Sequence, residues 1–138
     1  MQQNMIFVLG SPRSGSTMLQ RMLGSHADIY THPEPHIVTP LAHLGFFANV
    51  DKAPFDHINA AEALKEYVED LPSKDRDYYD ACAAYLDVLY GRMLGKSKRK
   101  MMLDRTPAYA LVIPFLTKVY PDAKYIVLTR HPLAIFTS

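Results

Sequence analysis

The chain has 138 residues, of which 49% are apolar and 21% are charged, and this is typical of one folded domain with a sizeable core. Its 15 basic and 14 acidic residues leave a net charge of +1, which gives no reason to expect a nucleic acid or a membrane surface as a partner. The single cysteine, Cys82, excludes an internal disulfide and a cysteine-based zinc site, and it fits a reducing compartment.

The N-terminal residues do not resemble a targeting segment. Met1-Gln2-Gln3-Asn4 lacks the positive charge that begins a signal peptide, and the apolar run at 5–10 is too short for its hydrophobic region. No apolar run in the sequence approaches the ~20 residues of a membrane-spanning helix. We therefore expect a cytoplasmic protein.

Apolar periodicity and turn residues divide the chain into strands and helices. In chain order, the pattern predicts strand 5–9, helix 16–25, strand 28–31, helix 36–47, helix 61–71, helix 75–94, strand 101–103, helix 108–119 and strand 124–129. Residues 49–60 are expected to form a loop, and Gly95 is expected to end the longest helix. That helix is expected to bury a stripe made of Tyr78, Ala81, Cys82, Tyr85, Leu86, Leu89, Tyr90 and Met93.

Strands separated by helices indicate an α/β fold, with a P-loop-like parallel sheet, right-handed crossovers and flanking helices in three layers. Residues 1–138 are expected to form a single domain. A helix that starts near Pro132 has room for only about two turns before Ser138, so we expect this domain to be C-terminally incomplete. Polar residues follow Leu9, Leu103 and Leu128, and ligands bind outside such strand ends. The polar segments are therefore expected to converge on one site.

The stretch 10–17, Gly-Ser-Pro-Arg-Ser-Gly-Ser-Thr, lies between the first predicted strand and the first predicted helix. This arrangement wraps backbone N–H groups around a phosphate. The spacing fits the nucleotide-binding pattern G-x-x-x-x-G-K-S/T, but Ser16 stands where that pattern has the lysine that reaches the β- and γ-phosphates. Arg13 is the obvious alternative cation, so the loop is predicted to bind a phosphate group other than the triphosphate of ATP.

Two motifs together resemble the sulfotransferases that use 3′-phosphoadenosine-5′-phosphosulfate (PAPS), with the bacterial and tyrosylprotein branches as the most similar. The first is Pro-Arg-Ser-Gly-Ser-Thr after the first strand, and the second is Tyr-Ile-Val-Leu-Thr-Arg-His-Pro at 125–132. The resemblance implies that PAPS is the donor and that no metal is needed. It implies a cradle for the 5′-phosphosulfate made of Arg13, Ser14, Gly15, Ser16 and Thr17. It also implies a 3′-phosphate site made of Arg130 and Ser138.

The resemblance to the tyrosylprotein branch also implies a general base at Glu34, in the segment His32-Pro33-Glu34-Pro35-His36. Cytosolic sulfotransferases use a histidine base, so His32 and His36 are alternatives. The His-x-Glu-x-His spacing suggests a metal, but the two prolines disfavour the required helical geometry. Arg105 occupies the position of a lysine in relatives and is expected to neutralise charge on the bridging oxygen or the sulfuryl group.

The sequence therefore predicts transfer of a sulfuryl group to a hydroxyl or amine of a small-molecule or peptide acceptor. The acceptor pocket is expected to involve residues 36–60 and 61–94, which carry no recognisable signature. Two alternatives come from other classes of protein. One is a P-loop small-molecule kinase, which is disfavoured by the missing lysine, and the other is a nucleotide-binding fragment without turnover. Asp104 is expected to orient or cap its neighbours.

Overall fold

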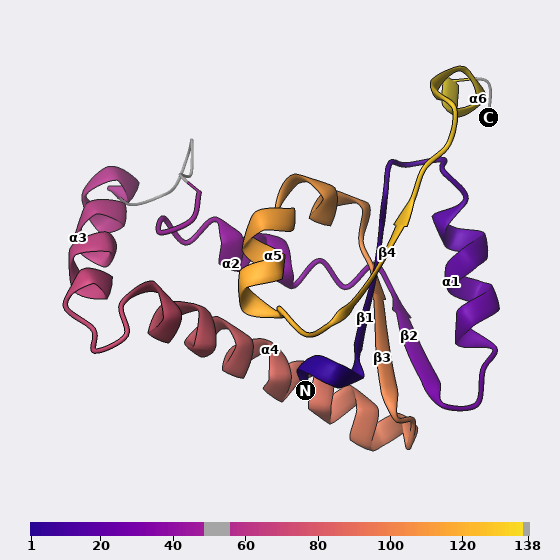
Figure 1. The fold of residues 1–138 in the computed structure, drawn as a ribbon, viewed down its shortest axis with the longest axis horizontal. Coiled ribbons are helices and arrows are strands. Elements are labelled where there is room, and N and C mark those ends of the chain that lie inside the picture. The colour runs from indigo at the N-terminus through magenta and orange to yellow at the C-terminus, as the bar shows by residue number, and fades with distance from the viewer. Residues whose placement is uncertain (49–55, 137–138) are drawn as a thin grey trace.

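The computed structural model of the chain describes residues 1–48 and 56–136. At its centre lies a parallel sheet of four strands in the order β2-β3-β1-β4 (Figure 1). The strands are β1 (Met5–Gly10), β2 (Ile29–Pro33), β3 (Met101–Arg105) and β4 (Lys124–Leu128). The predicted α/β fold is thus confirmed, and all strands end at the same edge of the sheet.

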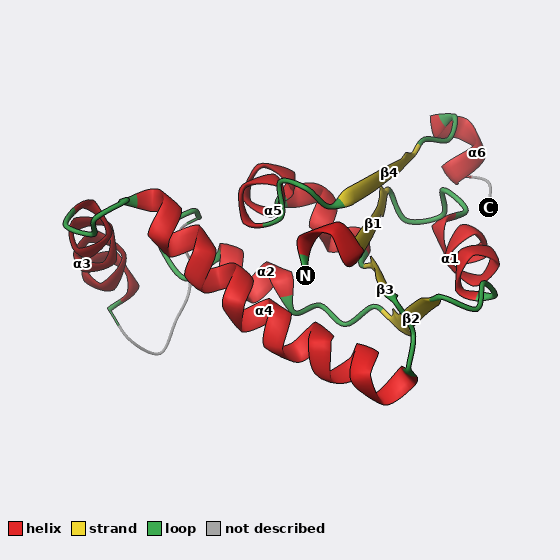
Figure 2. Cartoon of the chain, turned by 60° about the horizontal axis from the view of Figure 1, so that its bottom comes forward, coloured by secondary structure: helices red, strands yellow, loops and turns green. Residues whose placement is uncertain are grey.

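Helices cover both faces of the sheet, which gives three layers (Figures 1 and 2). On one face, Leu19 and Leu23 of α1 (Ser16–Gly24) pack against Ile6 and Val8 of β1. The opposite face is covered by α2 (Val38–Ala42), α4 (Asp75–Ser97) and α5 (Ile113–Val119). Short helices lie at the two ends of the chain, namely the 3₁₀ turn Gln2–Asn4 and α6 (Pro132–Phe136).

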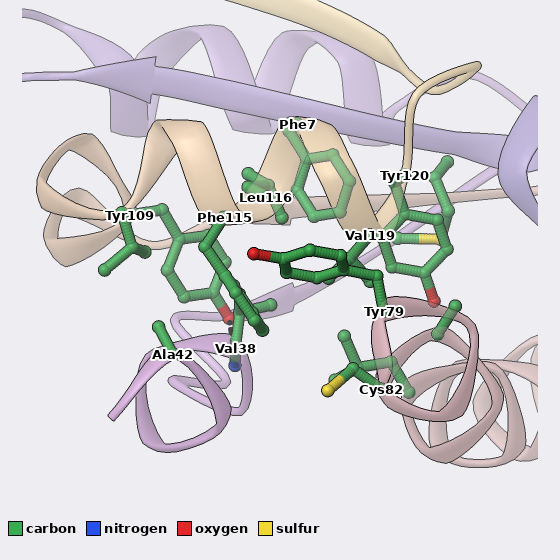
Figure 3. Close-up of a cluster of buried hydrophobic side chains, with 14 of the residues drawn as sticks. Phe7, Val38, Ala42, Tyr79, Cys82, Tyr109, Phe115, Leu116, Val119 and Tyr120 are labelled. Carbon is green, nitrogen blue, oxygen red and sulfur yellow. Dashed lines mark hydrogen bonds between the residues drawn. The ribbon is translucent and has the colours of Figure 1, made fainter. Parts of the chain in front are cut away.

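The larger core is rich in aromatic rings and lies between the sheet and α4 and α5 (Figure 3). The ring centroid of Phe7 lies 5.6 Å from that of Tyr120 and 5.5 Å from that of Tyr125. Every residue of the run 5–9 is at most 6% exposed, as expected for a central strand of a parallel sheet with both faces covered. This packing fixes the point at which the glycine-bearing loop leaves β1.

The helix α3 (His57–Glu69) packs on α4, away from the sheet (Figure 1). It begins four residues before the predicted 61–71 helix, because the Asp56 side chain caps it by accepting a hydrogen bond from the Asn59 N–H at 3.1 Å. The predicted loop 49–60 is therefore wrong over its last residues. Its part at 49–55 lies outside the described residues.

Two predicted helices are shorter than the periodicity indicated. The predicted helix 36–47 is helical only over Val38–Ala42, and Gly45 then takes a φ of +109° where a Cβ would lie 2.9 Å from the Cβ of Ala61. The predicted helix 108–119 is divided into a 3₁₀ turn, Pro107–Leu111, and α5. The division lies at Val112, whose φ of −126° is not helical, and Pro114 in the first turn of α5 has no N–H with which to continue the hydrogen bonding of the 3₁₀ turn.

The longest helix, α4, differs from prediction at its end and in its buried stripe. It continues through Gly95 to Ser97, because a glycine inside a helix costs only about 1 kcal/mol and does not by itself end it. Its buried side chains include Tyr79 and Ala83, whereas Ala81, Tyr85 and Leu89 of the predicted stripe are exposed. No helix in the described ranges is long and apolar enough to cross a bilayer.

Candidate functional site

The loop between β1 and α1 has the backbone of an anion cradle. Arg13 and Gly15 have φ angles of +65° and +96°, and the Ser14 N–H donates to the Ser11 carbonyl at 3.2 Å. Gly15 is the N-cap of α1, so the first N–H groups of that helix face the loop. A Cβ on Gly10 would lie 2.8 Å from the Leu128 carbonyl oxygen, so β4 approaches the start of the loop closely. The glycine spacing of this motif thus matches a tight turn.

The hydroxyl of Ser14 is compatible with an anion bound in this loop. Ser14 is buried, and among the described residues its Oγ has no hydrogen-bond partner. A buried hydroxyl without a partner is unfavourable, whereas a phosphate or sulfate oxygen could accept its hydrogen. The side chains of this loop are therefore compatible with the phosphosulfate group that the sequence implies.

Arg105 joins the loop to the neighbouring strand end. It is the last residue of β3, it is 8% exposed, and its Nε donates to Ser16 Oγ at 3.0 Å. Its Nη2 donates to Thr17 Oγ1 at 2.5 Å, and its Nη1 pairs with the carboxylate of Glu34. The guanidinium therefore contacts both hydroxyl side chains that begin α1 and the predicted base at the same time.

Glu34 reaches Arg105 because β2 and β3 are paired in register. Pro33 lies opposite Arg105 in the parallel ladder, so the residue after β2 emerges beside it. The Glu34 side chain is 42% exposed, and its Oε2 lies 3.6 Å from His36 Nε2. The Nδ1 of His32 lies 2.9 Å from the Pro33 carbonyl oxygen, within its own turn. Within the described residues, no group of three or more His, Cys, Asp or Glu side chains is placed to hold a metal ion.

Arg130 lies across the mouth of the loop. It follows β4, it is exposed, and its Nη1 donates to the backbone carbonyl of Arg13 at 2.9 Å. Its predicted partner Ser138 lies outside the described residues. The second phosphate motif thus lies beside the first, although they are separated by about a hundred residues of sequence.

These side chains line one pocket of about 720 Å³. Its lining consists of Pro12, Arg13, Gly15, Ser16, Thr17, Met18, Arg21, Glu34, Arg105, Pro107 and Arg130. Four guanidinium groups and a single carboxylate make it strongly cationic, and its residues come from the carboxyl ends of all four described strands and from α1. Such a site attracts and orients a polyanionic ligand.

Sequence reasoning missed two parts of this region. Arg21 lines the pocket, and it could have been found because it lies four residues after Thr17 on the same face of α1. The second part is the set of hydrogen bonds around Asp104, a residue that was expected only to orient or cap its neighbours. Its Oδ2 accepts hydrogen bonds from the Tyr90 hydroxyl at 2.7 Å and from the Tyr109 hydroxyl at 3.0 Å. Burial raises the pKa of Asp104. No local pattern links these tyrosines to that carboxyl.

Comparison with known proteins finds relatives of this chain in sequence and in structure. A model described as the Sulfotransferase family matches residues 5–138. The nodulation protein NoeE of Sinorhizobium fredii is 33% identical over 133 residues, covering 96% of this chain and 30% of that protein. A putative protein-tyrosine sulfotransferase of Caenorhabditis briggsae is 24% identical over 136 residues, covering 99% of this chain and 42% of that protein.

Among solved structures, the sulfotransferase domain from the olefin synthase of Synechococcus PCC 7002 superimposes with a TM-score of 0.53 and 26% identity. The match covers 93% of this chain and 48% of that one. The chain thus spans less than half the length of each of these relatives.

Proposed function

Because this chain belongs to the sulfotransferase family, we propose that it transfers a sulfuryl group from PAPS to a hydroxyl or amine of a small-molecule or peptide acceptor. The observation that carries this proposal is the pocket in which four arginines and Glu34 surround a phosphate loop without the usual lysine. The similarity to a putative protein-tyrosine sulfotransferase supports a peptide as one class of acceptor. A single domain over 1–138 and a cytoplasmic location stay predictions.

In the proposed reaction, the acceptor oxygen or nitrogen attacks the sulfur of the donor. The bond between that sulfur and the bridging oxygen breaks, its electron pair stays on the departing 3′-phosphoadenosine-5′-phosphate (PAP), and the acceptor's proton passes to Glu34. Charge therefore develops on the bridging oxygen. In this proposal that charge is stabilised by the N–H groups at the start of α1, the Ser14 and Ser16 hydroxyls and the guanidinium of Arg105, which donates to Ser16 Oγ.

Glu34 is a better candidate for the general base than His32 or His36. It lines the pocket, whereas neither His32 nor His36 does, and His36 lies on the far oxygen of the same carboxylate. Arg105 pairs with Glu34 and also donates a hydrogen bond to Ser16 of the phosphate loop. In this proposal, the general base therefore lies next to the guanidinium that stabilises the charge on the bridging oxygen. This proximity is what an in-line transfer between a bound donor and an adjacent acceptor requires.

Selection of the donor is assigned to Arg130, with Arg13 and Thr17 completing the cradle. PAP carries a 3′-phosphate and ADP does not, so a guanidinium aimed at that group separates the two nucleotides. Ser138 is proposed as a second donor to this phosphate on the sequence motif alone.

The first test is calorimetric titration of the chain with PAP and, under identical conditions, with ADP. We expect PAP to bind at least about tenfold more tightly, a difference of about 1.4 kcal/mol. Equal affinities would contradict donor selection, and preference for ADP would favour the kinase alternative.

A second test separates an enzyme from a nucleotide-binding fragment without turnover. We expect Glu34→Gln to bind PAP about as well as the wild type and to lose transfer from labelled PAPS by about 100-fold or more, as expected for loss of a general base. Transfer that survives in Glu34→Gln would remove the base assignment, and absence of transfer in the wild type with any hydroxyl or amine acceptor would favour the fragment alternative.

A further inference from the structure

The turn that carries Glu34 has a strained backbone. Glu34 and His36 have φ angles of +31° and +54°, in the left-handed region that non-glycine residues rarely adopt. Pro33 and Pro35 flank Glu34 and fix their own φ angles, so the turn cannot relax by a local change at either neighbour. Such conformations persist only where surrounding structure enforces them, and they are concentrated at functional sites. The structure has an anchor on each side of this turn.

The anchor after the turn is the hydroxyl of Tyr109. It accepts a hydrogen bond from the Val38 N–H at 3.2 Å and donates to Asp104 Oδ2 at 3.0 Å. Tyr109, Val38 and Asp104 are each 0% exposed, so water does not compete for these bonds. In Figure 3 the Tyr109 hydroxyl points toward Val38, where α2 begins. One phenol oxygen therefore connects the start of α2 to β3.

The carboxyl of Asp104 is itself held in place. Tyr90 of α4 donates to its Oδ2 at 2.7 Å, and Thr106 donates to its Oδ1 at 3.0 Å. Because side chains alternate along a strand, Asp104 points into the aromatic core while the next residue, Arg105, points into the pocket. Strand β3 thus supplies Arg105, the ion-pair partner of Glu34, and Asp104, which holds the Tyr109 hydroxyl in place.

The anchor before the turn is Gln20 of α1. Its side chain is buried, and its Nε2 donates to the His32 carbonyl at 3.1 Å and to Thr31 Oγ1 at 2.7 Å. A buried amide with both bonds directed at the end of β2 fixes where that strand stops relative to the phosphate loop.

We infer that Tyr109 and Gln20 are positioning residues that hold the strained turn from both sides and so set the contact between Glu34 and Arg105. Neither residue lines the pocket, so each acts through the turn. The inference rests on the proposed function only in naming Glu34 as the base; the geometric part concerns Glu34 and Arg105 alone.

The chain offers a matched control, because Tyr90 and Tyr109 donate to the same oxygen of Asp104. Tyr90→Phe and Tyr109→Phe each remove one hydroxyl bond to that oxygen, but only Tyr109 also contacts the backbone after the turn. The readouts are the resonance of the Arg105 Nη1–H groups, which pair with Glu34, and the exchange rate of the Val38 amide, both measured by NMR. A Glu34→Ala spectrum supplies the position of the Arg105 resonance without its carboxylate partner.

We expect Tyr109→Phe to move the Arg105 resonance toward its position in Glu34→Ala and to speed Val38 exchange about tenfold. Tyr90→Phe should leave both unchanged, although it also loses a buried hydrogen bond. Gln20→Met, which serves also if Tyr109→Phe does not fold, should move the Arg105 resonance and leave Val38 exchange unchanged.

The inference is overturned if Tyr109→Phe and Gln20→Met leave the Arg105 resonance in place, or if Tyr90→Phe moves it equally. These measurements use neither donor nor acceptor. Failure of the chain to prefer PAP over ADP would therefore remove the proposed function and leave the positioning result to stand or fall by itself.

Discussion

Replacing Arg105 with methionine tests the arrangement at the centre of the pocket. Methionine keeps an unbranched side chain of similar length, so the change removes the guanidinium with little loss of packing. Arg105 is 8% exposed, and its guanidinium bonds to Ser16 Oγ, Thr17 Oγ1 and Glu34, on two segments that are distant from it in sequence. Its loss therefore releases all three partners at once.

The three partners differ in what they lose. Ser16 is 3% exposed, and leaving its hydroxyl without Arg105 costs about 1–3 kcal/mol. Thr17 is exposed and can bond to water instead. The Glu34 side chain is 42% exposed, so its half of the ion pair is screened and contributes about 0–1 kcal/mol. We expect Arg105→Met to lower the free energy of unfolding by about 2 kcal/mol.

The assay is urea unfolding followed by circular dichroism, for the wild type, Arg105→Met, Ser16→Ala and the double variant. A loss of about 2 kcal/mol moves the midpoint by about 1 M urea when the slope is about 2 kcal/mol per molar. The double-mutant cycle should show a coupling of about 1 kcal/mol between the two sites. A change in unfolding free energy below about 0.5 kcal/mol with no coupling would refute the reasoning. Such a result would mean that the guanidinium of Arg105 does not connect β3 to α1 in solution.

Three further predictions concern Arg130, Asp104 and Gly10. Arg130→Ala should weaken PAP binding by about 10–100-fold and change ADP binding little, whereas the control Arg21→Ala should affect both nucleotides similarly; calorimetry measures all four affinities. Burial raises the pKa of Asp104, so the folded state holds this proton more tightly than the unfolded state does. Stability from this group therefore falls as pH rises from about 3.9 through the folded pKa, and the advantage of the wild type over Asp104→Asn in urea midpoint should shrink over that window. Gly10→Ala should destabilise the chain by about 1–3 kcal/mol, because the new Cβ would lie 2.8 Å from the Leu128 carbonyl oxygen; an unchanged melting temperature would show that β4 does not approach so closely.

The local sequence pattern was sufficient to predict the helices and strands whose conformation depends on neighbouring residues. The apolar run Met5–Gly10 is followed by a glycine-bearing turn and an amphipathic helix. The bounds of β1, the loop and α1 could therefore be predicted within a residue or two. The same is true of β4, which follows a proline-containing turn. The convergence of the motifs at the carboxyl edge also followed, because it depends only on the strands being parallel.

The contacts within the site could not be predicted, because they depend on register and on tertiary packing. Arg105 meets Glu34 only because Pro33 is paired with it across β2 and β3, and a shift by one residue would turn the guanidinium to the other face. The left-handed conformation of Glu34 has no sequence signal at a non-glycine residue. The prediction of the buried stripe of α4 was partly wrong, because α3, α5 and β3 all contact that helix and the sequence does not show which of its residues they cover.

The separation in sequence of the pocket contacts affects how the protein folds. Arg105 meets Glu34 across 71 residues and Ser16 across 89, and Arg130 meets the backbone of Arg13 across 117. Contacts of this range form late, after the loops between them have closed, and no half of the chain can make the pocket alone. A ligand of this pocket therefore binds only the folded chain, and at concentrations well above its Kd it should raise the free energy of unfolding in proportion to the logarithm of its concentration. Nucleotide protection against proteolysis would thus measure the folded population of the whole sheet as well as occupancy of the site.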